Sequence, residues 1–182
     1  DNNSTVYYLD RIITAASIFF LLASIGVTFL FISRIFDAKI GGVTALLMLL
    51  CELLWRYSQS GLPQMLMLFL FTLGCYFVYR AVEAQCLEKK PIALLILGAV
   101  CFGLLALTHW MAIWPFMGLV IFSCFYFKPR GAAGLSMLIV FLIIILPWCF
   151  RNLNTSGDFL GSAYDGMFGG MGSAEEELFR SY

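Results

Sequence analysis

Apolar segments alternate with short polar segments along the chain, and within each apolar segment the hydrophobicity is continuous. Six apolar runs stand out, at residues 12–32, 43–54 (extending at most over 40–55), 65–79, 92–107, 111–127 and 135–149. About 20 helical residues, at about 1.5 Å each, cross a hydrocarbon core of about 30 Å. Strands of a membrane barrel would instead alternate over about ten residues. The pattern predicts an all-α fold, a polytopic transmembrane helix bundle of about six spans.

The composition points to the same class of protein. The chain has 182 residues, of which 62% are hydrophobic and 12% charged, and its mean hydropathy is +0.91. A soluble domain is nearer half apolar and a quarter charged. We therefore expect a multi-pass integral membrane protein in contact with the lipid bilayer. The formal net charge is zero and no basic run stands out, which argues against a nucleic-acid partner.

Basic residues are distributed unevenly over the connections between the predicted spans. The odd-numbered connections hold seven of the eleven Lys and Arg residues: Arg34, Lys39, Arg80, Lys89, Lys90, Lys128 and Arg130. By the positive-inside rule these connections face the cytoplasm, and both termini then face the extracytoplasmic side. In this topology every Trp falls at the outer end of a span, where interfacial aromatic residues are expected: Trp55, Trp110, Trp114 and Trp148. The polar motifs gather on the same outer side.

The polar stretch between the second and third apolar runs is the first candidate for a site. Glu52 and Arg56 have the favourable spacing for an ion pair within a helix. Ser60 or Gly61 is expected to cap the third span, with Pro63 in its first turn. Unpaired N–H groups at that helix start, beside Arg56, would bind an anion, and Gly61 would let a ligand approach the backbone. The alternative is an interfacial ion pair that only ends a span, with Arg56 snorkelling to the surface.

Other candidates follow later spans. His109, the only histidine, is either a hydrogen-bonded interfacial residue or a phosphate donor or proton carrier. Arg151 and Asn152 follow the sixth run, where a basic residue can simply stop a span. Paired carboxylates can serve acid–base chemistry, but a Gly-rich segment supports a precise site poorly. We therefore expect a solvated loop around the acidic residues of the tail: Asp158, Asp165, Glu175, Glu176 and Glu177.

The six cysteines are scattered and form no CxxC pair. Most of them lie inside apolar runs, where a thiol behaves as a small hydrophobic group. With a single histidine and no ligand spacing, the sequence contains no metal-binding motif. We interpret the cysteines as packing residues and expect no metal site.

Three stretches form a familiar pattern when taken together and in this order. LLWRYSQSGLPQM at 53–65 matches a turn of the form r-s-r-s-g-l-p-E that leads into a span. GLLALTH at 103–109 matches G-L-a-x-L-T-K/R, and LPWCFRN at 146–152, followed by Gly157 and Phe159, matches l-P-W-x-x-R-N…f-G. The chain therefore resembles the membrane glycosyltransferases of the GT-C type, which include the protein O-mannosyltransferases and the lipid A aminoarabinose transferases.

This resemblance implies a hexosyl- or pentosyltransferase in the bacterial cytoplasmic (inner) membrane. Such an enzyme moves a sugar from a polyprenyl-phosphate-linked donor to a protein or glycolipid acceptor on the extracytoplasmic face. Carried onto the matching positions, the resemblance assigns the lipid phosphate and the sugar to these residues: Arg56, Tyr57, Ser60, Gly61, Gln64, His109, Arg151 and Asn152. It names no certain cofactor and leaves open a role for a divalent metal.

The chain departs from the family pattern at two of these positions. Gln64 stands where an acidic residue is common, and His109 where Lys or Arg is common, which puts the handling of phosphate or acceptor in doubt. The catalytic Asp of the family lies in the first outer loop, and neither Asp1 nor Asp10 matches it. We expect a fragment cut at both ends, with the catalytic Asp upstream of residue 1, and assign no catalytic residue.

The sequence divides into a transmembrane region, 1–150, and an extracytoplasmic Gly-rich and acidic segment, 151–182. Two other interpretations stay open. A transporter or channel fragment would line a path with polar residues in mid-span, and these spans carry little besides scattered Ser, Thr and Gly. A non-catalytic membrane scaffold subunit would keep the spans and lack a catalytic acid.

Overall fold

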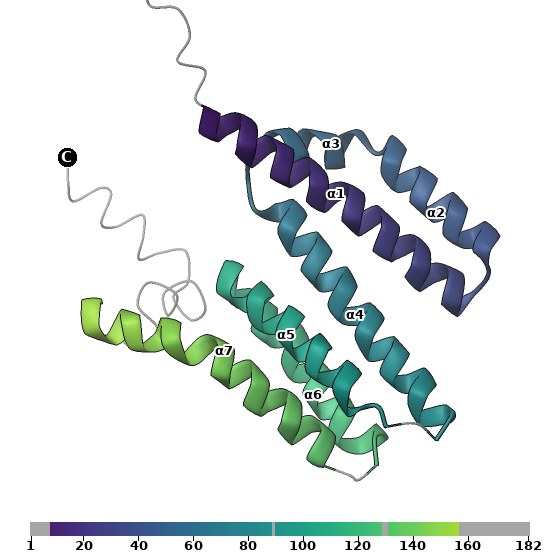
Figure 1. Ribbon diagram of the computed structural model, residues 1–182, viewed down its shortest axis with the longest axis vertical. Helices are drawn as coiled ribbons and strands as arrows, with labels where there is room; N and C mark the ends of the chain where they lie inside the picture. The colour runs from purple at the N-terminus through teal and green to yellow at the C-terminus, as the bar shows by residue number, and fades with distance from the viewer. Residues whose placement is uncertain (1–7, 89, 129–130, 157–182) are drawn as a thin grey trace, which may run out of the picture. The chain divides into compact units, whose positions relative to one another are not determined.

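The structure, a computed structural model, describes residues 8–88, 90–128 and 131–156, and these residues form helices without any strand (Figure 1). The helices are α1 (Tyr8–Ile35), α2 (Ala38–Leu50), α3 (Glu52–Gln59), α4 (Gln64–Cys86), α5 (Ile92–Thr108), the 3-10 helix η1 (Trp110–Ala112), α6 (Ile113–Tyr126) and α7 (Ala132–Ser156). The predicted all-α class is thus confirmed for the described part of the chain.

Three helices in the described part are long and apolar enough to cross a membrane, in α1, α4 and α7. The count rises to four if α2 and α3, which are bent by 56° at their junction, form one broken span. The remaining apolar helices, Ile92–Thr108 and Trp110–Tyr126, are shorter. Several helices of the described part are therefore long and apolar enough to span a membrane, while the count of six and the orientation of the termini stay predictions.

Two helix boundaries differ from those expected. The second apolar run is not one helix, because Cys51 interrupts it between α2 and α3. The sixth apolar run ends at residue 149, but α7 continues past Pro147 for nine residues to Ser156, so the expected domain boundary at residue 150 falls inside a helix. A proline removes one intrahelical hydrogen bond, and an apolar helix of 25 residues tolerates that loss. The acidic tail from residue 158 lies outside the described residues.

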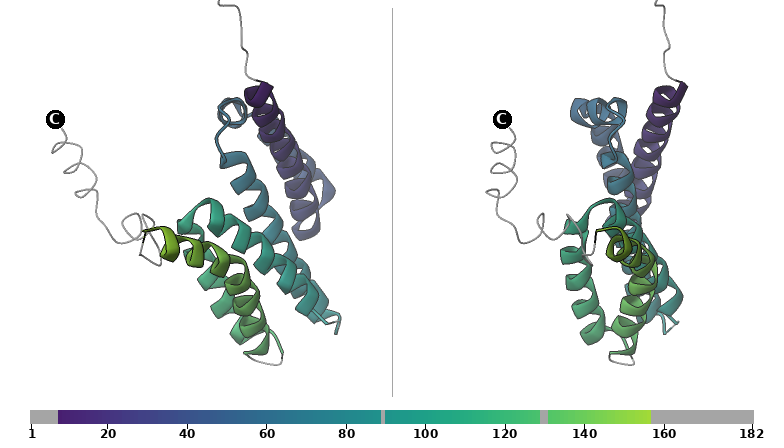
Figure 2. Two further views of the ribbon diagram at one scale, coloured as in Figure 1. Left: turned by 60° about the vertical axis from the view of Figure 1, so that its left-hand side comes forward. Right: turned by 90° about the vertical axis from the view of Figure 1, so that its left-hand side faces the viewer.

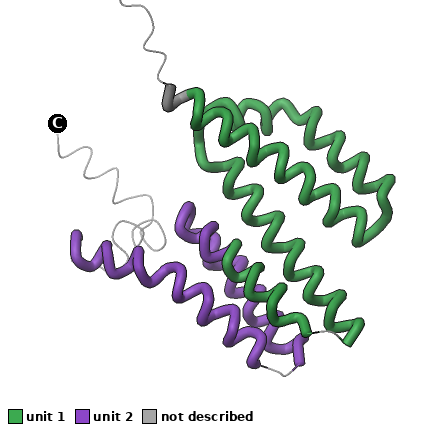
Figure 3. The backbone as a smooth tube through the Cα atoms, in the orientation of Figure 1, with its two compact units in different colours: residues 1–101 green, residues 102–182 purple. Residues whose placement is uncertain are grey.

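The chain consists of two compact units, residues 1–101 and 102–182, with α5 contributing to both (Figure 3). In the first unit α1 lies between α2 and α4, and α3 lies across the end where α1 begins (Figures 1 and 2). Ile13 of α1 lies against Gly61 in the turn before α4, and the contacts then advance together along both helices: Phe20 with Phe69, Phe31 with Tyr79 and Arg34 with Glu83. The two helices therefore run parallel.

Close packing of α2 on α1 depends on Gly41, which is buried. A Cβ atom at this position would lie 3.0 Å from the carbonyl oxygen of Phe29 and would also collide with the Ser33 side chain. The neighbouring Gly42 has nothing within 4 Å of a Cβ atom. Only the first of the two glycines is therefore required by the helix contact.

The second unit is organised around aromatic side chains. Phe116 of α6 stacks on Phe141 of α7, with ring centroids 4.0 Å apart, and Phe102 of α5 lies 6.1 Å from Phe116. A Cβ atom at Gly134 would collide with the Cys124 sulfur, so α6 and α7 also approach closely. Apolar packing of this kind connects the end of α5, η1, α6 and α7.

The glycine pair in α2 supplies a matched test of the α1–α2 contact. Gly41→Ala should lower the unfolding temperature in detergent micelles, because the methyl group meets backbone atoms of α1 that cannot move aside. Gly42→Ala should leave it unchanged or raise it, since alanine is favoured over glycine inside a helix by about 1 kcal/mol. Equal behaviour of the two variants, measured by thermal unfolding, would contradict the described contact.

Candidate functional site

The break between α2 and α3 is closed by a tryptophan. The indole Nε1–H of Trp55 donates to the carbonyl oxygen of Leu49 at 2.6 Å, across the junction. The Cys51 N–H donates to Met48 at 3.3 Å. A helix end leaves carbonyl groups without intrahelical donors, and the indole provides one of them with a partner. Trp55 therefore fixes the bend that turns α3 away from the direction of α2.

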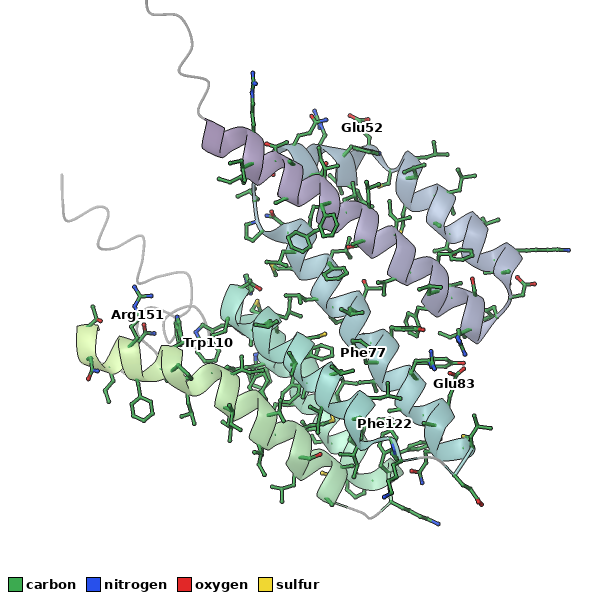
Figure 4. The ribbon with its side chains drawn as sticks, in the orientation of Figure 1. Glu52, Phe77, Glu83, Trp110, Phe122 and Arg151 are labelled. Carbon is green, nitrogen blue, oxygen red and sulfur yellow. The ribbon has the colours of Figure 1, made fainter. Side chains whose placement is uncertain are left out.

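The short helix α3 has one buried and one exposed face. Ser58 is fully buried, whereas the side chains of Glu52 and Arg56 are 84% and 77% exposed. Arg56 Nε lies 3.6 Å from Glu52 Oε1, so the predicted ion pair is confirmed. Glu52 projects outward from α3 (Figure 4). A pair this exposed is screened by solvent and adds little stability, which leaves the Arg56 guanidinium accessible to another anion.

The turn between α3 and α4 differs from the prediction. Ser60 does not cap α4; it is the C-cap of α3, where its N–H and its hydroxyl both donate to the Tyr57 carbonyl oxygen. The helix starts one residue after Pro63, which has no side-chain cap bond. The expected cap was wrong because the preceding helix, unforeseen from sequence, already uses the serine.

Gly61 has a structural role in this turn. Its φ angle is +71°, a conformation that favours glycine, and a Cβ atom there would lie 3.3 Å from the Ile13 side chain. The turn thus requires glycine without any ligand. Tyr57 is exposed, and Gln64, the first residue of α4, has a buried Oε1 atom with no hydrogen-bond partner among the described residues.

The second unit brings together another group of the expected residues. His109 is the N-cap of η1, and its Nδ1 accepts a hydrogen bond of 3.3 Å from the Met111 N–H. The next residue, Trp110, meets Trp148 of α7 edge to face, with ring centroids 5.2 Å apart. Figure 4 shows Trp110 and Arg151 at the same end of this unit. The ring contact therefore gathers the start of η1 and the last turns of α7.

Arg151 is exposed and Asn152 is half-buried, both on the part of α7 that continues past Pro147. The structure thus places the expected residues in two groups. The first unit holds Arg56, Tyr57, Ser60, Gly61 and Gln64; the second holds His109, Arg151 and Asn152. Among the described residues no three His, Cys, Asp or Glu side chains lie close enough to hold a metal ion.

The structure also contains a polar cluster that the sequence analysis missed. Near the C-terminal ends of α1 and α4, away from Arg56, the side chains of Arg34 and Arg80 both approach the Glu83 carboxylate. The spacing of Arg80 and Glu83 along one helix could have indicated their pairing. The participation of Arg34, 49 residues before Glu83, depends on the packing of α1 against α4.

Comparisons with known proteins leave the family open. Neither protein-family models, nor curated proteins, nor solved structures match this chain.

Removal of the indole hydrogen bond should loosen the α2–α3 junction. A hydrogen bond contributes about 1 kcal/mol net, so Trp55→Phe should make local opening about fivefold more frequent. Amide hydrogen exchange at residues 51–59 would show this as faster exchange. Trp114→Phe, at an exposed position on α6, is the control and should leave that segment unchanged. Unaltered exchange in Trp55→Phe would mean that the bond does not hold the bend.

Proposed function

We propose that this chain is a multi-pass membrane glycosyltransferase of the GT-C type, which transfers a sugar from a polyprenyl-phosphate carrier to an acceptor on the extracytoplasmic face. One observation carries the proposal. One of the three stretches that carry the resemblance, residues 53–65, presents an accessible arginine, Arg56, in the helix that precedes the uncapped start of α4. An uncapped helix start beside a cation is suited to an anion.

The proposed chemistry requires such an arrangement. When the sugar leaves, the carrier phosphate gains negative charge, and donors held in place at that point lower the barrier. The Arg56 guanidinium would take two phosphate oxygens. N–H groups of the first turn of α4 and the side-chain N–H of Gln64 would donate further hydrogen bonds to the phosphate. For His109, Arg151 and Asn152 of the second unit, a role in binding the donor stays a prediction that rests on the resemblance alone. A carboxylate would serve as base on the acceptor.

Large apolar side chains exposed on the helices support the membrane setting. Leu46, Leu47 and Leu50 of α2 are 54%, 64% and 71% exposed. Soluble monomers rarely expose broad apolar faces, whereas a bilayer covers them. The buried polar side chains of the described residues are all serines: Ser17, Ser24, Ser58 and Ser123. A transport path would want larger polar groups in mid-span, so the transferase is preferred over a transporter.

The parallel arrangement of α1 and α4 supports one part of the proposed topology. If α2 and α3 dipped into the bilayer and returned, α4 would begin where α1 ends. Instead Gly61, just before α4, lies against Ile13 near the start of α1. The helices α2 and α3 together therefore lead the chain from the end of α1 back to its start, as a single membrane crossing would. We extend this to six spans in the bacterial cytoplasmic membrane, with both termini outside and Lys39 inside.

Single cysteines can test this orientation in cells, after Cys86→Ser removes the exposed native thiol. Ser60→Cys should react with a membrane-impermeant maleimide applied to intact spheroplasts. Lys39→Cys should react only after the membrane is opened, because it lies at the other end of the crossing. The positive-inside rule sets this expectation. Labelling of Lys39→Cys from outside would reverse the proposed orientation.

The enzymatic proposal can be tested through Arg56. Membranes containing the full protein would be given polyprenyl-phosphate-linked hexoses and pentoses, and the released polyprenyl phosphate would be measured. Arg56→Ala should lower release by about 100-fold or more, the cost of removing one donor to a developing anion. Lys39→Ala, an exposed cation at the other end of the unit, should retain full activity. Both variants should insert normally.

Normal release by Arg56→Ala would remove this residue from the site. Absence of release by the unaltered protein, with every donor in the panel, would favour a non-catalytic scaffold.

A further inference from the structure

The polar cluster at the far ends of α1 and α4 consists of Arg34, Tyr76, Tyr79, Arg80 and Glu83. One carboxylate oxygen serves two arginines: Glu83 Oε2 lies 3.7 Å from Arg34 Nη1 and 3.2 Å from Arg80 Nε. Glu83 projects from α4 toward the end of α1 (Figure 4). The cluster thus contains two full positive charges and one negative charge.

Aromatic side chains surround the arginines. Arg80 Nη1 donates to the Tyr76 hydroxyl at 3.0 Å, and its guanidinium carbon lies 5.8 Å from the centre of the same ring. The Tyr79 hydroxyl donates to the Arg34 carbonyl oxygen at 3.2 Å. Phe31 packs edge to face against both tyrosines. These contacts hold the Arg80 guanidinium in place and fix the backbone of α1 at Arg34.

Among the described residues, Glu83 is the only carboxylate that forms an ion pair with either arginine. Arg34 lies in the last turn of α1, where the helix dipole offsets part of its charge. Arg80 lies more than a turn before the end of α4, beyond the reach of that effect. Asp37, the nearest acid in sequence, already accepts the Ile40 N–H at 2.7 Å as the N-cap of α2.

A single ion pair, between Arg34 of α1 and Glu83 of α4, would be enough to hold the two helices together. The side chains of Arg34, Arg80 and Glu83 also remain 49%, 35% and 29% exposed. They lie near the ends of two candidate spans, Arg11–Ile35 and Gln64–Cys86, at the level where tyrosine and phospholipid headgroups meet. A guanidinium at that level is well placed to bind phosphate with two hydrogen bonds.

We propose that Arg34 and Arg80 bind the phosphate of an anionic phospholipid, with Glu83 as an internal counter-charge that limits the affinity. The surplus positive charge in the cluster favours a ligand with negative charge. The surrounding aromatic residues favour a position of the cluster at the membrane interface. This site lies at the opposite end of α1 and α4 from Arg56, so it stands or falls independently of the transferase proposal.

Substitution of Glu83 distinguishes a lipid-binding site from a structural ion-pair cluster that only holds α1 against α4. In a lipid site, Glu83→Gln removes the competing negative charge, so the retention of anionic lipid rises. In a structural ion-pair cluster, the same substitution breaks both ion pairs, so the helices loosen and the retention of anionic lipid does not rise. The two interpretations therefore predict opposite results for one variant.

The experiment uses the full chain reconstituted in vesicles of phosphatidylglycerol and phosphatidylcholine. The protein is extracted in a mild detergent, and the phosphatidylglycerol that stays bound to it is measured by native mass spectrometry. A basic residue near a membrane surface contributes about fivefold to the binding of anionic lipid. Arg34→Gln and Arg80→Gln should each lower bound phosphatidylglycerol by about this factor, Arg34→Lys should lower it less, and Glu83→Gln should raise it. Lys39→Gln, the matched control at the same end, should change it little.

Several results would overturn the proposal. An unchanged amount of bound phosphatidylglycerol in both arginine variants, or a decrease in Glu83→Gln, would mean that the cluster is a structural ion-pair cluster only. An equal decrease in Lys39→Gln would mean diffuse attraction and no site. Displacement of the lipid by millimolar inorganic phosphate would identify free phosphate as the ligand. Helicity of each variant, measured by circular dichroism, separates these results from misfolding.

Discussion

The need to satisfy backbone hydrogen bonds in apolar surroundings constrains this protein most strongly. Without water, each N–H and C=O group needs a partner within the chain, and helices provide one. The break at Cys51 is the exception that shapes the first unit, because it frees carbonyl groups inside an apolar run. The Trp55 indole supplies a donor to one of them. The bend fixed in this way turns α3 across the end of the unit, exposes Arg56 and returns the chain to the start of α1.

Parallel packing of α1 and α4 then gives the first unit two chemically distinct ends. At one end lie the exposed Arg56 and the uncapped start of α4; at the other, two arginines share one carboxylate oxygen. Each end places arginine side chains, paired with glutamate, at the limits of apolar helices. Under the two proposals made above, one end would bind the phosphate of the sugar donor and the other the phosphate of an anionic phospholipid.

Glycine has separate structural roles at the two places where it matters most. Gly41 allows α2 to pack on α1, and Gly61 adopts a positive φ in the turn before α4. The sequence analysis interpreted Gly61 as room for a ligand, but the turn accounts for it fully. Ser60 was likewise interpreted as a cap for α4, whereas α3 uses it. In both cases an unforeseen neighbouring helix determined the role of the residue.

The helical class, the helices apolar enough to span a membrane and the local pairing of Glu52 with Arg56 could all be predicted from sequence, because hydrophobic runs and four-residue spacing are properties of contiguous residues. Tertiary packing alone establishes that Cys51 breaks the second run, that α1 and α4 run parallel, and that Trp110 meets Trp148. It also decided that Arg34 shares Glu83 with Arg80. These features join residues that are far apart in sequence or depend on competing contacts, and no local pattern records which of two possible partners a side chain will meet.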